Sequence, residues 1–427
     1  MLAAAVIAVA MAAPVRAQNA PPVESLTIDQ AVAEALSKNL SLLAERYNLT
    51  VADARIITAK LRPNPVLTLD ADHQDLLGTG FNTDTNNGGP VEYSIRTDYL
   101  LERGGKRQAR IEVAEGNRVV AQLQLLNTVR GILMDVQNAF VDLQSAKDSL
   151  KLAQENLQTL HDVVDINQKR VKSGDLSEVE LLRTQVAELQ FENSVRQADL
   201  RVKTATAKLQ ILLGRTKNSR PFDIAGDLRR EPIPPNQDAL MEQARQMRPD
   251  LLALVRDQAR SQAEIRNQLA LGKVDYTVGT EYRRQQKTAH ANTLGFFFQT
   301  NIPVFNRNQG EIERARQEQR QIEARIRAIE ATVDNDVEVA YQQFATARAT
   351  LEKIEQTMLN KAREVRSITE YSYRRGEASF VEFLDAQRAY NDTMQAYNDA
   401  RADFARSLFT IDSATGASTA PGKVTIP

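Results

Sequence analysis

The chain contains an internal repeat, and this feature constrains its fold more than any other. Residues 174–187 (GDLSEVELLRTQVA) and 376–389 (GEASFVEFLDAQRA) align without a gap and share seven of fourteen residues. The same offset carries Gly214 onto Gly416. Two further matches occur in the same order, residues 31–44 with 239–253 and Thr97-Asp98 with Thr300-Asn301. The sequence therefore predicts a duplicated unit of about 200 residues.

The join between the two units is rich in proline and polar residues, which is typical of a linker. We therefore expect five segments along the chain. These are a signal peptide at 1–17, a first structural repeat at 18–214, a linker at 215–237, a second structural repeat at 238–412 and a flexible C-terminal tail at 413–427.

The N-terminus has the pattern of a secretory signal. Residues 2–13 (LAAAVIAVAMAA) are apolar, and Val15 and Ala17 form a small-residue cleavage site before Gln18. The basic residues that usually precede the apolar stretch are missing, and a disordered apolar tail is the alternative. No run of 18 apolar residues follows residue 18, so a chain that spans a membrane would have to do so with strands.

The helices are expected to be long and packed side by side. Apolar residues from Leu126 to Val164, and again from Ile322 to Met358, recur in steps of three and four, as in coiled coils. At 1.5 Å per residue, a helix of this length reaches about 100 Å, with two shorter helices stacked end to end beside it. The expected helices are residues 29–61, 105–172 and 176–213 in the first repeat, and 238–270, 308–374 and 377–411 in the second.

Each repeat is also expected to carry two strands, in which apolar and polar residues alternate. The expected strands are residues 65–74, 91–100, 273–284 and 293–302. Segments of about ten residues cross a bilayer at a tilt, whereas a sheet packed on the helices would alternate in the same way. Four strands cannot close a barrel without free edges, so we expect oligomerisation, and three copies would supply twelve strands.

Composition excludes several classes of function. With 54 basic and 55 acidic residues, the net charge of −1 gives no basic surface for nucleic acid. There is no cysteine, which removes disulfides and thiolate sites, and the three histidines are scattered. No nucleophile elbow, phosphate-binding loop or zinc-protease motif occurs. We therefore expect no enzyme, no catalytic residue, no cofactor and no metal site.

Several motifs together resemble those of the TolC-like outer membrane factors, the outer membrane efflux proteins. They are Leu61-Arg62-Pro63-Asn64-Pro65 before the first strand, Gly104-Gly105-Lys106-Arg107 and Phe305-Asn306-Arg307-Asn308-Gln309-Gly310 after the strand pairs, and Tyr371–Ser379 with Leu384-Asp385-Ala386-Gln387 at the end of a long helix. The likeness covers nearly the whole chain after the signal. The two motifs after the strand pairs are similar to the heavy-metal (cobalt–zinc–cadmium) branch.

This resemblance implies a fold that is mainly α with a transmembrane β-barrel contribution. It implies a homotrimer with a twelve-stranded outer-membrane barrel, an α-helical periplasmic tunnel, and an equatorial belt formed by the linker and the tail. Its implied partners are outer-membrane lipid, a periplasmic adaptor (membrane fusion protein) and an inner-membrane pump of the RND type. The implied function is passive conduction of metal cations or drugs out of the cell by a tripartite efflux system.

The resemblance also places a gate and a docking site at the periplasmic tips. Glu180 and Glu382 follow the tip glycines at equivalent positions, with Asp385 close behind, and a ring of carboxylates would favour cations. A solvated outer face is the alternative. The residues expected to contact the adaptor are Ser173, Gly174, Asp175, Arg374, Arg375, Gly376, Glu377 and Ala378. Tip cations such as Arg170 would pair with carboxylates of neighbouring helices, or simply complement the helix dipole.

Two other functions share parts of this pattern. A protein-secretion (type I) conduit has the same architecture. A periplasmic coiled-coil adaptor or scaffold shares the helices but has no use for four strands of membrane-crossing length.

Overall fold

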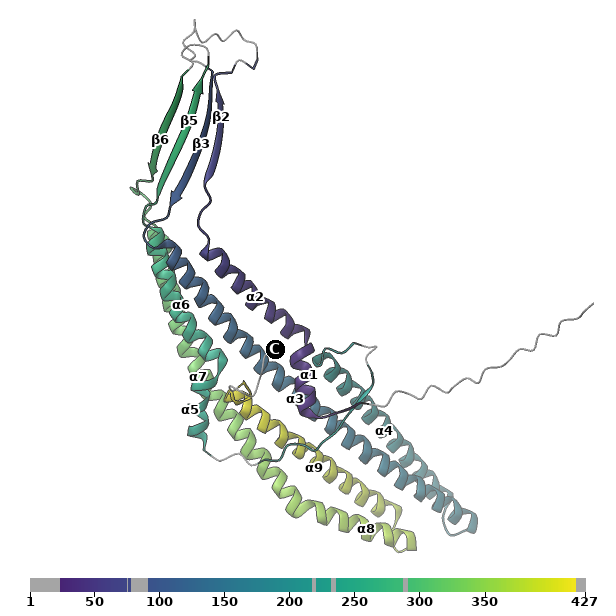
Figure 1. The fold of residues 1–427 in the computed structure, drawn as a ribbon. Helices are drawn as coiled ribbons and strands as arrows, with labels where there is room; N and C mark the ends of the chain where they lie inside the picture. The colour runs from purple at the N-terminus through teal and green to yellow at the C-terminus, as the bar shows by residue number, and fades with distance from the viewer. Residues whose placement is uncertain are drawn as a thin grey trace, which may run out of the picture.

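The computed structural model describes residues 24–74, 76–77, 91–216, 220–231, 236–286 and 291–419. The expected signal peptide at 1–17 lies outside the described residues, as does the expected tail from residue 420 onward. Figure 1 shows an elongated molecule with a sheet at one end and long helices running away from it. The chain is mostly helical and has few strands.

The same order of elements occurs on both sides of the linker. The first half contains α1 (Ile28–Lys38), α2 (Leu40–Lys60), β2 (Val66–Asp72), β3 (Glu92–Leu101), α3 (Lys106–Ser173) and α4 (Glu178–Leu212). The second half contains α5 (Gln237–Met247), α6 (Pro249–Leu271), β5 (Tyr276–Gln285), β6 (Asn292–Thr300), α7 (Gln309–Lys353), η1 (Ile354–Met358), α8 (Leu359–Arg375) and α9 (Phe380–Ala414). Two short strands, β1 (Glu24–Leu26) and β4 (Phe222–Ile224), pair in parallel and join the start of the chain to the linker.

Both helices expected before the strands are broken, at Asn39 and at Arg248. Asn39 has an extended backbone, and its side chain accepts hydrogen bonds from the N–H groups of Ser41 and Leu42, so α2 begins with a new N-cap. Arg248 precedes Pro249, whose ring disfavours the helical conformation in the residue before it. The expectation of unbroken helices at 29–61 and 238–270 was therefore wrong.

Two left-handed glycines fit against these breaks. Gly214 follows α4 with φ +69°, and a Cβ there would lie 2.2 Å from the carbonyl oxygen of Lys38. Gly416 follows α9 with φ +74°, and its Cβ would lie 2.9 Å from the carbonyl oxygen of Met247. Only glycine tolerates both the positive φ and the close backbone approach, which explains its presence at both positions.

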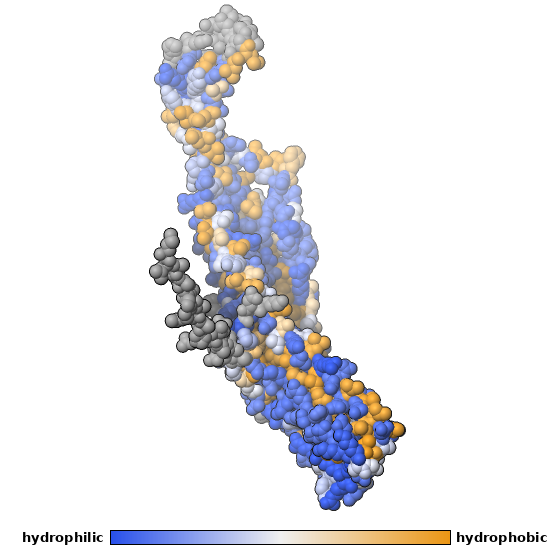
Figure 2. Space-filling view, turned by 90° about the vertical axis from the view of Figure 1, so that its right-hand side faces the viewer, coloured by the Kyte–Doolittle hydropathy of each residue, from blue (hydrophilic) through white to orange (hydrophobic). Residues whose placement is uncertain are grey.

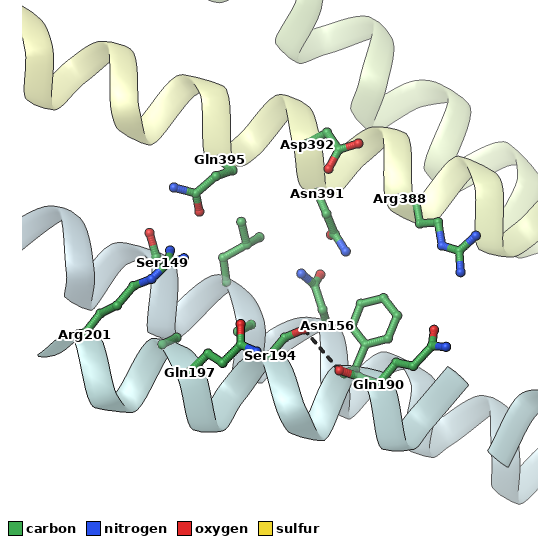
Figure 3. A pocket seen from close by; sticks show the side chains of 14 residues that line it. Ser149, Asn156, Gln190, Ser194, Gln197, Arg201, Arg388, Asn391, Asp392 and Gln395 are labelled. Carbon is green, nitrogen blue, oxygen red and sulfur yellow. Dashed lines mark hydrogen bonds between the residues drawn. The ribbon is translucent and has the colours of Figure 1, made fainter. Parts of the chain in front are cut away.

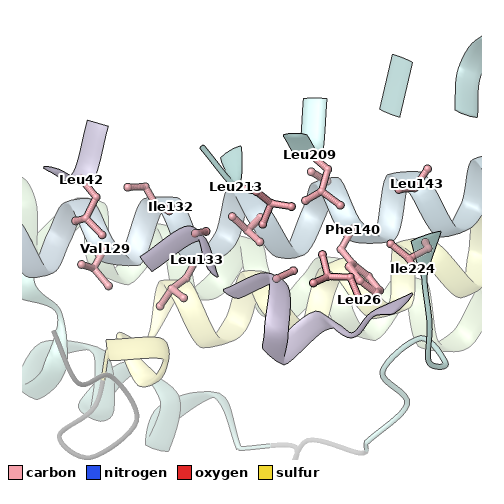
Figure 4. Packing of buried hydrophobic residues seen from close by; sticks show 14 of the residues in the cluster. Leu26, Leu42, Val129, Ile132, Leu133, Phe140, Leu143, Leu209, Leu213 and Ile224 are labelled. Atoms are coloured by element: carbon pink, nitrogen blue, oxygen red, sulfur yellow. The ribbon is translucent and has the colours of Figure 1, made fainter. Parts of the chain in front are cut away.

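The helix α3 forms the spine of the molecule. Helices α2 and α4 run end to end along it, and α6 and α9 contact its other side (Figure 1). Figure 4 shows the main core, in which α3 packs against α1, the end of α4, and the two short strands. Its largest fully buried members are Leu42, Val129, Val136, Leu209 and Leu213. The periodic apolar stripe of the sequence is thus the packing face of α3.

In the second half, the helix expected at 308–374 contains a π-helical segment, η1. The N–H of Leu359 donates to the carbonyl of Ile354, five residues back. Glu355 within this segment accepts a hydrogen bond from the Tyr397 hydroxyl of α9 at 3.2 Å and forms an ion pair with Arg230 of the linker. Such segments often mark functional positions in helices, and the linker is attached here.

The four longer strands form an antiparallel sheet in the order β2-β3-β5-β6. Leu67, Ile95, Val278 and Phe296 belong to one face, whose large apolar side chains are exposed. The opposite face is polar, and its ion pairs join Arg96 to Asp98, and Arg283 to Glu92 and Glu281. Within this chain, β2 and β6 each have one neighbour in the sheet, so each leaves one edge unpaired.

The end of the described chain is ordered as helix. The helix α9 continues to Ala414, and residues 417–419 form a short 3-10 helix, so the first residues of the expected tail pack on the helical body. Among the residues that the structure describes, none of the helices combines the length and the apolar character needed to cross a membrane.

Candidate functional site at the helical tips

The first tip is the turn between α3 and α4. Gly174 has φ +80° and ends α3, and the N–H of Asp175 donates to the carbonyl of Arg170 at 2.8 Å. The Ser173 hydroxyl donates to the Asp175 carboxylate at 2.8 Å. Ser177 then caps α4 by accepting from the N–H of Glu180. The Gly and Ser of the repeated motif are therefore the stop and start signals of a tight helical hairpin.

The second tip, between α8 and α9, repeats this geometry. Gly376 has φ +80°, the N–H of Glu377 donates to the carbonyl of Ser372 at 2.9 Å, and Ser379 caps α9. Ala378 packs against the buried tip cluster that is described below.

The acidic candidates have different surroundings in the two tips. Glu382 completes a capping box, because its carboxylate accepts from both the N–H (2.7 Å) and the hydroxyl (2.9 Å) of Ser379. These two hydrogen bonds, the backbone one first, lower the pKa of Glu382 below its ordinary value. Glu180 instead lies 3.8 Å from Arg183 of its own helix, and Asp385 is exposed. Within one chain, no hydrogen bond or shared cation among the described residues joins the three carboxylates.

The tip cations bind carbonyls and their own helices. Arg170 reaches across from α3 and donates to the carbonyl oxygens of Arg374 (2.6 Å) and Tyr373 (3.4 Å), at the end of α8. Arg374 pairs with Glu370 one turn back, and Arg375 lies over the ring of Tyr371. Arg170 therefore caps the end of α8, in the second hairpin of the same chain. The expected pairing of tip cations with carboxylates of neighbouring helices is not seen within this chain among the described residues.

A buried polar chain links the two tips. The Tyr373 hydroxyl of α8 donates to Asn167 Oδ1 of α3 at 2.8 Å, and Asn167 Nδ2 donates to Thr184 Oγ1 of α4 at 2.9 Å. Thr184 in turn donates to the carbonyl of Glu180. Burial raises the pKa of Tyr373. The sequence analysis did not predict these hydrogen bonds. Asn167 lies three residues after Val164, at the next position of the apolar stripe of α3, and a polar residue at that position is the signal that could have indicated them.

The same tips share a small apolar core. Phe383 is fully buried, and its ring stacks on that of Tyr373 with centroids 5.3 Å apart. Phe380 packs beside both rings, and Leu160 and Val163 of α3 complete the contact between the hairpins. The two tips are therefore one packed unit in this structure.

A groove runs between α3/α4 and α9, above this core. It has a volume of about 400 Å³, and ten of the fourteen residues that line it are polar (Figure 3). Gln190, Ser194 and Arg201 lie on one wall, and Arg388 and Asp392 of α9 lie on the other. A second hollow of about 430 Å³ nearer the turn is apolar and is lined by Val179, Leu182, Val186, Phe380, Val381 and Leu384 among others.

The structure describes two of the three histidines. His73 follows β2 with a positive φ, and His161 Nδ1 lies 2.8 Å from the Glu188 carboxylate, which raises the pKa of His161. His290 lies outside the described residues. In the described part of the chain, no group of three or more histidine or acidic side chains could hold a metal ion.

Comparison with known proteins gives the family. The sequence profile of the family described as "Outer membrane efflux protein" matches residues 31–215 and 240–417. The cobalt-zinc-cadmium resistance protein CzcC of Cupriavidus metallidurans is 25% identical over 394 residues, covering 92% of this chain and 90% of CzcC.

Solved structures share the fold. The CmeC outer membrane channel of Campylobacter jejuni superposes with a TM-score of 0.77 at 14% identity, covering 91% of this chain and 85% of CmeC. The outer-membrane channel OprN superposes with a TM-score of 0.74 at 17% identity, covering 92% of this chain and 91% of OprN. With the profile matching most of its length, the chain belongs to the outer membrane efflux protein family, and its place is the outer membrane.

Proposed function

We propose that this chain is the outer-membrane channel subunit of a tripartite efflux system. Three copies form a closed conduit, and substrates pass through it without a chemical step. A periplasmic adaptor and an inner-membrane pump of the RND type deliver the substrates to the tips.

The sheet carries this proposal. It has two unpaired edges and an exposed apolar face, and both are costly in water. Pairing β6 of one copy with β2 of the next satisfies both edges, and lipid covers the apolar face. Four strands from each of three copies form a twelve-stranded cylinder, which is wide enough to leave a lumen.

The helices also leave apolar side chains uncovered. Figure 2 shows such residues gathered near the tip end of the molecule. The exposed large apolar side chains of the helices include Leu182, Val186 and Leu189 of α4 and Val365 and Ile368 of α8, toward the tips, and Leu43, Tyr47 and Val51 of α2, which lies nearer the sheet. Copies packed side by side would cover these surfaces, which supports a helical tunnel below the barrel.

Divalent metal cations are the proposed substrates. CzcC is by name a cobalt-zinc-cadmium resistance protein. The polar face of the sheet, which would line the lumen, carries more carboxylates than cations. Its acidic residues Asp70, Asp72, Glu92, Asp98 and Glu281 outnumber Arg96 and Arg283. An acidic lining lowers the barrier to cations.

The tips supply the proposed gate and the docking surface. Glu180, Glu382 and Asp385 would ring the axis in three copies, and the Arg170 and Asn167 contacts would hold the hairpins together in the closed state. The turn residues 173–175 and 374–378, with the groove above them, would receive the helical end of an adaptor.

Closure of the sheet is tested by cross-linking. The chain has no cysteine, so Leu69→Cys on β2 can be combined with Cys at Leu294, Phe296 or Phe298 on β6. The proposal expects covalent dimers and trimers for at least one pair. The matched control is Leu69→Cys with Ile95→Cys, which lie opposite each other within one sheet and should cross-link only inside a chain. A protein that remains monomeric with every pair would contradict a closed barrel.

Substrate class is tested in a deletion strain. The chain should restore tolerance to cobalt, zinc and cadmium when it is expressed with its adaptor and pump. Loss of a secreted protein on deletion, with unchanged metal tolerance, would instead identify a protein-secretion conduit.

A further inference from the structure

Basic side chains collect where the strands meet the helices. The segments 60–65, 101–107, 272–276 and 301–310 contain seven cations and only two carboxylates, Glu102 and Asp275. Glu102 pairs with Arg110, and Asp275 pairs with Lys106 at 2.6 Å. Among the described residues, none of the six remaining cations forms an ion pair. We call these six the basic collar: Lys60, Arg62, Arg103, Arg107, Lys273 and Arg307.

Arg103 lies on the apolar face of the sheet. Its guanidinium lies 4.2 Å from the ring centroid of Tyr276, and that ring contacts the ring of Phe298, with centroids 5.1 Å apart. Tyr276 and Phe298 belong to the exposed apolar face that carries Val278 and Phe296. Arg103 therefore stands at the lower border of the surface that lipid would cover, where phosphate groups of a bilayer begin.

Other collar residues are held in place by backbone contacts. The Arg107 guanidinium donates to the carbonyl of Lys60 at 2.7 Å, and that of Arg307 donates to the carbonyl of Pro303 at 3.2 Å. The stem of Lys273 lies against Gly104, where a Cβ would come within 2.4 Å of it. These contacts orient the charges but leave them without a counter-ion.

Exposed apolar residues accompany these charges. Ile302, Val304 and Phe305 follow β6 directly, and Phe305 is 92% exposed. Figure 2 shows apolar residues on the sheet, above helices whose adjoining part is mainly hydrophilic. A cation beside an uncovered apolar side chain is typical of a protein surface in the interfacial zone of a bilayer.

We propose that the basic collar binds the headgroups of anionic phospholipids in the periplasmic leaflet of the outer membrane. The inference rests on the proposed function, because it requires the sheet to be closed in a bilayer. Closing the sheet would bring the end of β6, with Arg307, beside the start of β2 of the next copy, with Arg62. Arginines donate paired N–H groups to phosphate oxygens in bidentate geometry, and a phosphate between them offsets their mutual repulsion. The acyl chains continue along the apolar face.

Lipid retention tests the proposal. Full-length protein is purified in detergent, incubated with phosphatidylglycerol or phosphatidylcholine, and analysed by native mass spectrometry. Wild type should retain phosphatidylglycerol in preference to phosphatidylcholine. In the double variant Arg103→Gln/Lys273→Gln, phosphatidylglycerol retention should fall about twenty-five-fold, since each of the two basic residues at a membrane surface adds roughly fivefold in affinity for anionic lipid. Phosphatidylcholine retention should not change.

Arg256→Gln is the matched control, because it removes an exposed cation of α6 that lies outside the collar. It should retain both lipids as wild type does. Equal retention of the two lipids by wild type, or unchanged phosphatidylglycerol retention in the double variant, would overturn the proposal. Conductance in planar bilayers separates this result from the channel function. If the double variant conducts ions but still retains phosphatidylglycerol, only the lipid-binding proposal is contradicted. If the wild type does not conduct ions, the proposed channel function is contradicted.

Discussion

The two tips are built on the same turn but are stabilised differently. In both, a left-handed glycine ends one helix and a serine caps the next. The second tip, however, has Phe380 and Phe383 where the first has Glu178 and Leu181. Both hairpins contribute to the apolar core under the turns, but its aromatic rings are supplied largely by the second hairpin. The turn needs only a glycine and a serine, whereas the packing beneath it is free to differ between the two halves.

The long helices that lead to the two tips also differ between the two halves of the chain. The helix α3 is unbroken over 68 residues, whereas its counterpart is interrupted by η1, to which Arg230 attaches the linker. The first hairpin thus extends from a continuous spine. The second hairpin extends from an interrupted helix and is held to the first through its tip. If this contrast is correct, substitutions at equivalent positions should have unequal effects.

The largest inequality is expected in the tip core. Phe383→Ala removes a fully buried ring and should cost about 3–5 kcal/mol in the free energy of opening of the α8–α9 hairpin. Leu181→Ala, at the equivalent position of the first tip, removes a half-buried side chain and should cost about 1 kcal/mol. Hydrogen exchange of the amides at both tips measures the two values. Similar losses at the two positions would show that the tips are stabilised in the same way.

The next effect concerns the polar link between the hairpins. Tyr373→Phe keeps the stacked ring but leaves the buried Asn167 Oδ1 without its donor. A lost partner of this kind costs about 1–3 kcal/mol, and the loss should appear as faster exchange at the end of α8. The double variant Tyr373→Phe/Asn167→Leu removes both polar groups and should recover part of the stability. If the double variant is no better than the sum of the single changes, the link carries no coupling.

Much of what distinguishes the two tips could be predicted from the sequence, and the features that could not be predicted have a physical reason in common. Local signals such as Gly174, Ser177 and strand alternation depend on short-range chemistry, and the four strands begin and end within three residues of the expected positions. The capping role of Glu382 also rests on a local signal, the Ser-x-x-Glu capping box that begins with Ser379, and its role in a gate stays a prediction. The π segment and the Tyr373–Asn167 bond depend on which helices meet in space, and periodicity alone does not record that.

A smaller effect is expected at the π segment. Glu355→Ala removes the ion pair with Arg230 and the hydrogen bond from Tyr397. Because the Arg230 and Glu355 side chains are 54% and 30% exposed, the pair should contribute at most about 1 kcal/mol. Exchange should increase locally at residues 353–359 and not along α3. Glu352→Ala, which removes only a surface pair with Arg348, is the control. Equal exchange in the two variants would mean that the linker does not stabilise η1.

The smallest effect distinguishes Glu382 from Glu180 by its pH dependence. The hydrogen bonds from Ser379 lower the pKa of Glu382 in the folded state, so its carboxylate stabilises the fold above the unfolded pKa near 4.5. This contribution is lost as the pH falls through the lowered folded pKa. Protection of the first turn of α9 should therefore be weaker in Glu382→Ala than in wild type at pH 7, and the difference should shrink below about pH 4.5.

Two control variants sharpen this measurement. Glu382→Gln can still accept a hydrogen bond from the N–H of Ser379, so it should keep a protection that does not depend on pH. Glu180→Ala removes a carboxylate that makes no capping bond to Ser177 and should change the first turn of α4 less. An equal loss in Glu382→Ala and Glu180→Ala, shrinking alike below about pH 4.5, would show that the two glutamates act only as charges near a helix N-terminus, and the contrast between the tips would then rest on their apolar residues alone.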